Sequence, residues 1–406
     1  MNSPSADTTP LILFGAFDRH NFGDLLFPHI AAALLPDKNL LFAGLAERDL
    51  RAYGGHRVAA LPGLLDELGG QKADLMHVGG EILTCSAWEA AAMLLPPETA
   101  QRTIVRLDAR PQERPAWTRE ALRTDALAPY CVSRTRRKQI NRVIFNAVGG
   151  VALDEIPASM RAEVLANLRA ADAIGVRERH TLAHLSSAGI TAHLMPDPAV
   201  MVAELFGDRI RQRCIQAEVA QIRQRFPHGY LAVQFSANFG DDATLSAIAA
   251  KLDQASAENG LGIVFFRAGA ATWHDDLDVY RRCAARMTTT ATAIFESLHL
   301  WDICALIAAS RGFCGSSLHG RIVATAFALP HVSLLADESL PHASKQAAYA
   351  SAWEPLAMIG MTGTRHLATQ LAQALAANPE LLRQTADRLA AEYRQGFSAQ
   401  YAVLSA

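Results

Sequence analysis

Short apolar runs alternate with longer helical patterns along almost the whole chain, and this alternation constrains the fold more than any single motif. In the first half we expect strands at 11–17, 39–44, 73–80, 142–150, 173–178 and 192–196. Helical patterns lie between them, at 23–35, 86–95, 159–170 and 180–188. Nearly continuous apolar strands separated by helices favour a parallel sheet that is covered on both faces.

The second half repeats this pattern. Strands are expected at 229–236, 260–269, 311–316 and 330–335, and helices at 208–225, 242–258, 274–286, 299–309, 318–328, 343–352, 364–376 and 378–396. The sequence therefore predicts an α/β chain with two Rossmann-type, doubly wound domains and a cleft between them. Ligands of such sheets bind outside the carboxyl ends of the strands, where the strand order reverses.

The predicted boundaries follow from the same pattern. Residues 1–10 are expected to be a disordered lead-in, 11–205 the first domain and 206–360 the second. The C-terminal helices of 361–406 are expected to return to the first domain. The break falls before the charged helix that begins at 207, since that helix follows the loop after "MPDPAV".

Composition excludes several classes of protein. The 406 residues carry a formal net charge of −2, whereas a general nucleic-acid binder has a basic excess. The sequence has no run of about 18 apolar residues and no signal-peptide pattern at its start. Its six scattered cysteines show no CxxC pair and no zinc-site spacing, so we expect reduced thiols, no metal and a cytoplasmic, bacterial-type enzyme.

The stretch "GAFDRHNFGDLLFPHI", residues 15–30, is far more polar than a strand-to-helix turn requires. A turn needs glycine and one Asn or Asp. This one holds, around Gly15 and Gly23, the residues Asp18, Arg19, His20, Asn21 and Asp24. An acid in the first turn of a helix has an electrostatic rationale of its own, which covers Asp24 but not the rest. We therefore interpret the stretch as part of a functional site.

Two further strand ends carry chemistry. Gly79 and Gly80 end an apolar strand, where paired glycines permit either a tight turn or close approach of a ligand to the backbone. Arg177 ends another strand, suitably placed to bind phosphate or carboxylate, or else to pair with Glu178 on the surface. In "PDPA", two prolines fix a corner, so Asp197 has a simple role as a turn or cap residue.

The fourth junction, "GFCGSSLHGRIVATAFALP", is a predicted anion site. Ser316 and Ser317 follow a strand, and the helix that begins near Leu318 presents its first N–H groups outward. A cation at a helix N-terminus opposes the macrodipole, so a structural role does not account for His319 and Arg321 there. Two more cations are expected to reach the anion, Arg267 after "GIVFF" and Lys345.

Together these motifs resemble the polysaccharide pyruvyl transferase family. The resemblance runs from about residue 12 to 350 and rests on the order of "NFGD", "HVGG", "VRERHT", "MPDPAV" and "SSLHGRIVATAFALP". It implies a GT-B-like fold and transfer of the enolpyruvyl group of phosphoenolpyruvate onto two hydroxyls of a sugar or lipid-linked glycan precursor, with release of phosphate. It implies exopolysaccharide biosynthesis and phosphoenolpyruvate as donor substrate, with no separate cofactor.

Within the resemblance, Asn21 and Asp24 match the family's NxGD element, Arg177 its RD/RE element and His319 the histidine that helps hold phosphoenolpyruvate. One position departs from the family. Where the family has arginine directly before Leu-His, this chain has Ser317. Arg321 lies four residues further on, on the same helix face, and is one candidate to substitute; Arg19 and His20 are further candidates, as extra cations beside the NxGD element. Either the anion is held differently in this chain, or the donor is different. Asp24 is then the expected base, with His319 or His20 as the acid.

Two alternatives stay open. The first is a GT-B glycosyltransferase that uses a nucleotide sugar, with Glu296, Asp337 and Glu338 binding the ribose. The second is a repurposed member with a different donor or a non-polysaccharide acceptor, an alternative that Ser317 supports. The basic run of 133–142 is either a solvated surface or a contact with a phosphate-bearing acceptor at the inner face of the membrane.

Overall fold

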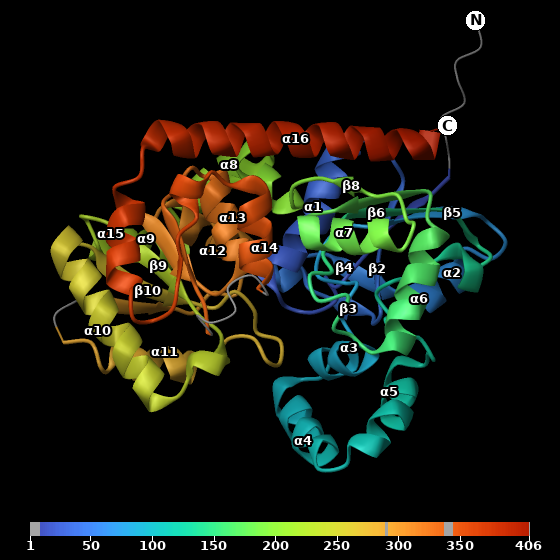
Figure 1. Cartoon of the computed structure of the whole chain (residues 1–406), viewed down its shortest axis with the longest axis horizontal. Helices are drawn as coiled ribbons and strands as arrows, with labels where there is room; N and C mark the ends of the chain where they lie inside the picture. Colours follow the sequence, from blue (N-terminus) through green and yellow to red (C-terminus); the bar gives the residue numbers. More distant parts are fainter. Residues whose placement is uncertain (1–8, 289–290, 337–343, 406) are drawn as a thin grey trace, which may run out of the picture. The chain divides into compact units, whose positions relative to one another are not determined.

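The computed structural model describes residues 9–288, 291–336 and 344–405, so the expected lead-in of 1–10 lies almost wholly outside it. The chain forms two compact units (Figure 1). Unit 1 contains the residues up to Arg19, then Asp24–Pro198 and the end of the chain from Tyr393. Unit 2 contains His20–Gly23 and Ala199–Glu392. The short segment His20–Gly23 therefore belongs to the second unit, although both of its chain neighbours belong to the first.

Unit 1 is built on an eight-stranded sheet in the order β3-β4-β2-β1-β5-β6-β7-β8, in which only the β3–β4 pair is antiparallel. Its strands are β1 Leu11–Phe14, β2 Leu40–Gly44, β3 Arg48–Asp49, β4 Arg57–Ala60, β5 Ala73–His77, β6 Ile140–Val148, β7 Ala173–Val176 and β8 His193–Leu194. Its helices are α1 Phe22–Leu34 (from Asp24 onward), α2 Leu61–Glu67, α3 Ala87–Met93, α4 Pro97–Asp108, α5 Arg114–Leu122, α6 Ala158–Arg169 and α7 Arg179–Ser187.

Unit 2 is built on a six-stranded, wholly parallel sheet in the order β11-β10-β9-β12-β13-β14. Its strands are β9 Tyr230–Gln234, β10 Gly262–Phe266, β11 Thr292–Phe295, β12 Gly312–Gly315, β13 His331–Leu334 and β14 Met361–Thr362. Its helices are α8 Val202–Arg213, α9 Ala217–Arg225, α10 Asp242–Asn259, α11 Leu277–Ala284, α12 Leu300–Ala308, α13 Leu318–Ala326, α14 Lys345–Trp353 and α15 Leu367–Leu375.

The expected fold class is confirmed: both units are parallel sheets with crossover helices, and each has its own apolar core. The last helix, α16 Pro379–Ser405, contributes its residues up to Glu392 to unit 2 and the remainder to unit 1. Among the described residues, no helix combines the length and hydropathy needed to cross a bilayer.

A helical insertion between β5 and β6 is the largest departure from the sequence pattern. No helix was expected between residues 96 and 141, yet α4 and α5 lie there and, in Figure 1, project from the sheet of unit 1. Helix α4 begins with Pro97, at the one helical position where proline costs nothing. Its buried residues Ala100, Ile104 and Leu107 recur at three- and four-residue spacing, so a helix is what this segment's apolar face requires.

His77, at the end of β5, is a buried structural histidine. Its ring stacks on Phe145 at 3.9 Å between centroids. Its Nδ1 donates to the carbonyl of Ile144 (3.2 Å) and its Nε2 accepts from the N–H of Val132 (3.0 Å), which defines the neutral ring. Burial lowers the pKa of His77 to about 3.

This histidine makes unit 1 less stable in acid. Since its pKa is lowered in the fold, the unfolded chain binds the extra proton below pH 6.5, and stability is lost as the pH falls. Between pH 7.5 and 5.5 we expect His77 alone to cost about 1.4 kcal/mol. In urea denaturation at the two pH values, His77→Gln should show a smaller loss than the parent by that amount. His228→Gln, which changes an exposed histidine, should behave like the parent; equal losses in all three proteins would contradict the assignment.

Candidate anion site on the second unit

The strand order of unit 2 reverses at β9. The chain passes from β9 to β10 on one side, and later reaches β12 on the other side. The carboxyl ends of these three strands are followed by Phe235, Arg267 and Ser316, and two of them are predicted site residues. Adjacent strands are about 4.8 Å apart, so Arg267 and Ser316 leave the sheet about 10 Å from each other. This is the position at which doubly wound sheets bind their ligands.

Ser317 is the N-cap of α13. Its backbone is extended (φ −81°, ψ 121°), and its Oγ accepts a hydrogen bond from the N–H of Gly320 at 3.1 Å. Neighbouring Ser316 accepts from the N–H of Ser236 at 3.0 Å, which joins the ends of β12 and β9. Among the residues that the structure describes, neither serine hydroxyl donates a hydrogen bond, so both can serve as donors. The first N–H groups of a helix have no intrahelical acceptor, and in α13 only that of Gly320 is capped by Ser317. The turn can therefore bind an anion.

The turn after Arg267 is held by Asp275. One carboxylate oxygen accepts from the N–H groups of Ala268 (2.5 Å) and Gly269 (3.3 Å), and the other accepts from the Gln234 amide at 2.7 Å. Burial raises the pKa of Asp275 to about 7. Arg267 itself is half-buried, and its Nε has no hydrogen-bond partner among the residues that the structure describes.

The same turn is hydrogen-bonded to the segment His20–Gly23. Asn21 forms an antiparallel bridge with Gly269, and the N–H of Phe22 donates to Ala268 O at 2.8 Å. The Asn21 side chain donates to His274 at 3.1 Å and accepts from the N–H of Gly23 at 3.1 Å. The predicted residues Asn21 and Gly23 thus lie in unit 2 and support the turn that carries Arg267.

Gly23 and His319 are in direct contact. A Cβ atom built on Gly23 would lie 1.9 Å from Nδ1 and 2.0 Å from Cγ of the His319 ring. The ring is 9% exposed and meets Phe22 edge-on, with centroids 6.4 Å apart. Only glycine fits at position 23, because the imidazole occupies the space of a side chain. Two predicted residues separated by almost 300 positions are therefore brought together within one unit.

His20 is bound on both sides of its ring, which argues against its predicted role as an acid. Its Nε2 donates to the carbonyl of Leu298 at 2.7 Å, and its Nδ1 accepts from the N–H of Ala270 at 3.1 Å. Burial lowers the pKa of His20, which keeps the ring neutral. The histidine fixes two loops and offers no proton to a ligand.

Arg321 is likewise committed, and this corrects the expectation that it replaces the missing arginine. Its guanidinium is fully buried, with Nε donating to Glu354 at 2.8 Å and Nη1 to Ser333 Oγ at 3.0 Å. Glu354 also contacts His331 at 3.1 Å. Burial favours the neutral acid, but the charge of Arg321 and the contact with His331 outweigh it and lower the pKa of Glu354 to about 2. Arg321 lies one turn beyond Ser317, as the spacing predicts, but its side chain points into the fold.

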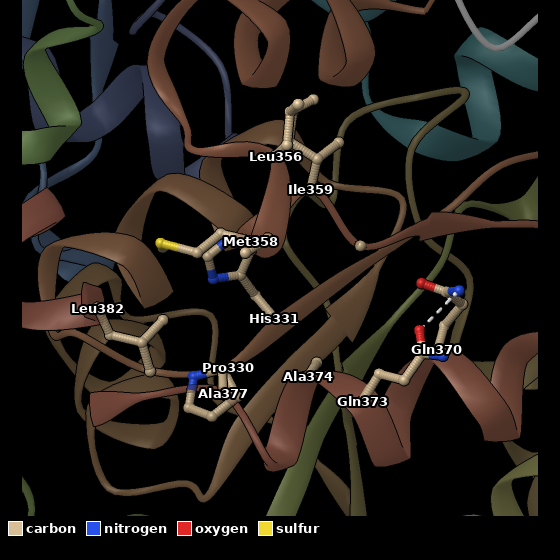
Figure 2. Close-up of a pocket in the computed structure, with 12 residues that line it drawn as sticks. Pro330, His331, Leu356, Met358, Ile359, Gln370, Gln373, Ala374, Ala377 and Leu382 are labelled. Atoms are coloured by element: carbon tan, nitrogen blue, oxygen red, sulfur yellow. Dashed lines mark hydrogen bonds between the residues drawn. The ribbon is translucent and has the colours of Figure 1, made fainter. Parts of the chain in front are cut away.

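A cavity of about 310 Å³ adjoins this buried cluster, because His331 lines it (Figure 2). Pro330, His331 and Gly360, which line it, stand at the starts of β13 and β14, so the cavity opens at the amino edge of the sheet. Its polar side chains are already paired: His331 with Glu354, and Gln370 with Gln373 at 3.1 Å. The cavity is therefore separate from the predicted anion site.

In unit 1, Asp24 lies beside the paired glycines. A Cβ on Gly80 would lie 3.3 Å from an Asp24 carboxylate oxygen. Gly79 and Gly80 both have positive φ (132° and 93°), a conformation that side chains disfavour. The structure thus brings three predicted residues together at the carboxyl end of β5.

Arg177 is a structural ion-pair residue. It is 2% exposed, donates to Asp197 at 2.8 Å and to Glu81 at 2.6 Å, and so links β7 with the loops after β5 and β8. Because both carboxylates already compensate its charge, Arg177 is a weak candidate for binding a further anion. Arg177 is therefore not the surface partner of Glu178, and its ion pairs within unit 1 do not support the predicted contact with an anion.

The remaining polar residues of the opening stretch hold unit 1 together. Asp18 is fully buried and accepts from the N–H groups of Leu45 (2.6 Å) and Ala46 (3.2 Å) and from the Tyr130 hydroxyl (2.7 Å). Burial raises the pKa of Asp18. Arg19 donates to the same hydroxyl at 3.0 Å and lies over the Tyr130 ring.

The remaining predicted residues are exposed or lie outside the described residues. Lys345 is exposed at the start of α14, next to Gln346, whose side-chain amide donates to the carbonyl of Ser316. Glu296 is exposed and pairs with Arg281, while its expected partners Asp337 and Glu338 lie outside the described residues. In the basic run, Arg134 pairs with Asp172 at 3.0 Å.

Sequence reasoning missed Asp275, Gln234, Tyr130 and Glu354. The acids of "WHDDLD", residues 273–278, suit the start of a helix, and this accounts for Asp276, the N-cap of α11, but not for Asp275. The available signal was the position of Asp275 eight residues after a predicted site arginine. The other three residues carry no local signal.

The contact between Gly23 and His319 generates a test. We expect Gly23→Ala to lower the stability of unit 2 by about 1–3 kcal/mol, because the added methyl group displaces the ring. Adding His319→Ala should recover most of this loss, which urea denaturation of the single and double variants would measure as a coupling energy. Gly63→Ala in α2, where nothing lies within 4 Å of the new methyl group, is the matched control. Independent, additive effects would contradict the contact.

Comparisons with known proteins agree on fold and family. A similar solved structure is a UDP-GlcNAc 2-epimerase from Neisseria meningitidis bound to UDP-GlcNAc, with 12% identity, 97% of this chain and 99% of that chain covered and a TM-score of 0.54. The MnaA–UDP structure from S. aureus also has 12% identity, with 93% and 91% covered and a TM-score of 0.54. A trehalose 6-phosphate synthase from Burkholderia multivorans has 12% identity, with 98% and 97% covered and a TM-score of 0.50.

These similarities establish a GT-B-like fold, as expected from the sequence. No curated protein matches the sequence. The family described as polysaccharide pyruvyl transferase matches residues 118–338, a little over half of the chain, and agrees with the motif-based resemblance. The protein is therefore a transferase and a member of the polysaccharide pyruvyl transferase family.

Proposed function

We propose that the protein transfers the enolpyruvyl group of phosphoenolpyruvate to a sugar or a lipid-linked glycan precursor as a cyclic ketal. The observation that carries the proposal is the position of Arg267 and of the capped N-terminus of α13, which follow the carboxyl ends of the two strands that flank β9, where the strand order of unit 2 reverses. The family membership supplies the reaction class. The setting that we propose is exopolysaccharide synthesis in a bacterial cytoplasm, with a lipid-linked acceptor presented at the inner face of the membrane.

The donor brings a phosphate and a carboxylate, and its charge requires compensation. Arg267 supplies a full positive charge, and the first N–H groups of α13 supply the positive end of a helix dipole. The hydroxyls of Ser316 and Ser317 add neutral donors. With Arg177 and Arg321 committed to buried carboxylates, Arg267 is our choice for the cation that the family places before Leu-His.

The reaction needs two proton transfers. A proton is added to the methylene carbon of the donor, and the positive charge that develops at the ketal carbon is attacked by a sugar hydroxyl. A second hydroxyl then attacks the same carbon as its bond to phosphate oxygen breaks. The two hydroxyl protons account for the new methyl hydrogen and for the proton on the released phosphate. We assign His319 as the acid and Asp24 as the base that accepts a hydroxyl proton.

Binding of the donor tests the proposal. Titration calorimetry of the purified chain with phosphoenolpyruvate should show binding that Arg267→Ala and His319→Ala each weaken by at least about tenfold, the cost of a lost charge-assisted contact. Ser317→Arg should bind more tightly than the parent, since it restores a cation.

The control variant is Arg223→Ala, which removes an exposed arginine of α9 and should bind like the parent. UDP-GlcNAc and UDP form the second arm of the titration. Binding of these nucleotides without binding of phosphoenolpyruvate would favour a nucleotide-sugar glycosyltransferase. Phosphoenolpyruvate binding that is insensitive to Arg267→Ala would contradict the proposed site.

A further inference from the structure

A second cavity, in unit 1, has the chemistry of a sugar-binding subsite. It measures about 260 Å³, which is close to the lower limit of pockets that hold small ligands. It lies between the helical insertion and the start of α6, and much of its wall is apolar: Trp88, Pro115, Leu127, Pro157 and Met160. Such a cavity admits a single ring rather than an extended chain.

Thr118 supplies a buried polar group in this wall. The residue is 6% exposed, and its hydroxyl has no hydrogen-bond partner among the residues that the structure describes. A buried hydroxyl without a partner is costly, so a purely apolar occupant would leave this cost in place. A ligand that brings a hydroxyl of its own into the cavity removes it.

Trp88 provides an aromatic wall. The guanidinium of Arg114 lies 5.0 Å from the centre of its indole ring, and Trp117 meets the ring edge-on at 5.5 Å. These contacts fix the indole in one orientation. The apolar C–H face of a pyranose ring suits such a surface, whereas its hydroxyls suit the polar rim formed by Ser86, Thr124 and Ser159.

The charges at the rim select a neutral ligand. Arg114 donates to Asp108, and Arg119 pairs with Asp125 at 2.5 Å, so both arginines that line the cavity already have a carboxylate partner. A phosphate or carboxylate would compete with these pairs. The described part of the cavity therefore fits an uncharged ring better than an anion.

The cavity is also close in sequence to the strand ends. Ser86 follows Gly80 by six residues at the carboxyl end of β5, and Pro157 follows the carboxyl end of β6 by nine. We propose that this cavity binds a neutral pyranose ring of the glycan acceptor, with its C–H face on Trp88 and one hydroxyl on Thr118. The assignment of that ring to the acceptor rests on the proposed function.

The test is saturation-transfer NMR of the full chain with the methyl pyranosides of glucose, galactose, mannose, N-acetylglucosamine and N-acetylmannosamine. At least one should receive saturation, mainly on its C–H protons. Trp88→Ala should abolish the signal and Trp88→Phe should keep it, since phenylalanine retains an aromatic wall. Thr118→Val should weaken binding about five- to tenfold, as expected for one lost hydrogen bond.

Trp273→Ala, which removes a partly exposed tryptophan of unit 2, is the matched control and should bind like the parent. Absence of saturation with all five glycosides would overturn the proposal, as would a signal unchanged in Trp88→Ala. Binding of octanoate, an apolar carboxylate, without binding of any glycoside would also overturn the proposal, because the cavity would then prefer an apolar chain to a sugar ring. If phosphoenolpyruvate binds and no glycoside does, the sugar site in this cavity is rejected and the proposed donor stands. If a glycoside binds and phosphoenolpyruvate does not, the proposed donor is rejected and the sugar site stands.

Discussion

The segment His20–Gly23 and the turn after β10 form the interaction on which the candidate site depends. Asn21 bridges to Gly269, and the N–H of Phe22 donates to the carbonyl of Ala268. Asp275 accepts from the N–H groups of Ala268 and Gly269. Arg267 immediately precedes this doubly held turn. A long arginine side chain contributes most to anion binding when its backbone is already ordered, because less conformational entropy is lost on binding.

Ser317 then has a physical explanation beyond the loss of an arginine. As an N-cap it stabilises α13 by about 1 kcal/mol and orders the first N–H groups of that helix. An arginine in its place would bring charge but no cap. We propose that Arg267, which follows the strand on the other side of β9, supplies the charge instead. Arg177 and Arg321 were also predicted to bind the anion. Each instead forms ion pairs with carboxylates of its own unit.

The two Rossmann-type parallel sheets could be predicted from the sequence because strand and helix periodicities are local signals. The GT-B-like fold was implied by the resemblance to the family. The helices α4 and α5 were not predicted. The stretch "LLPPE" (94–98) resembles a loop, because a proline at the first position of a helix cannot be distinguished in the sequence from one that breaks a helix. The strand-end rule selected the carboxyl ends of the strands, where the structure places several of the predicted polar residues. It did not distinguish a ligand-binding cation from a structural one, because the partners of Arg321 and Arg177 lie 33, 20 and 96 residues away. Asp18 and His20 are a second example. Their clustering in the sequence indicated that they form hydrogen bonds, but it did not show that their partners lie within the protein rather than in a ligand.

The central claim is that unit 2 binds an anion between Arg267 and the N-terminus of α13. A crystal structure grown in the presence of phosphoenolpyruvate measures this most directly. We expect phosphate density within hydrogen-bond distance of the Arg267 guanidinium and of the Ser316–Ser317 turn, with His319 beside the donor. A donor molecule bound elsewhere, with Arg267 turned to solvent, would contradict it.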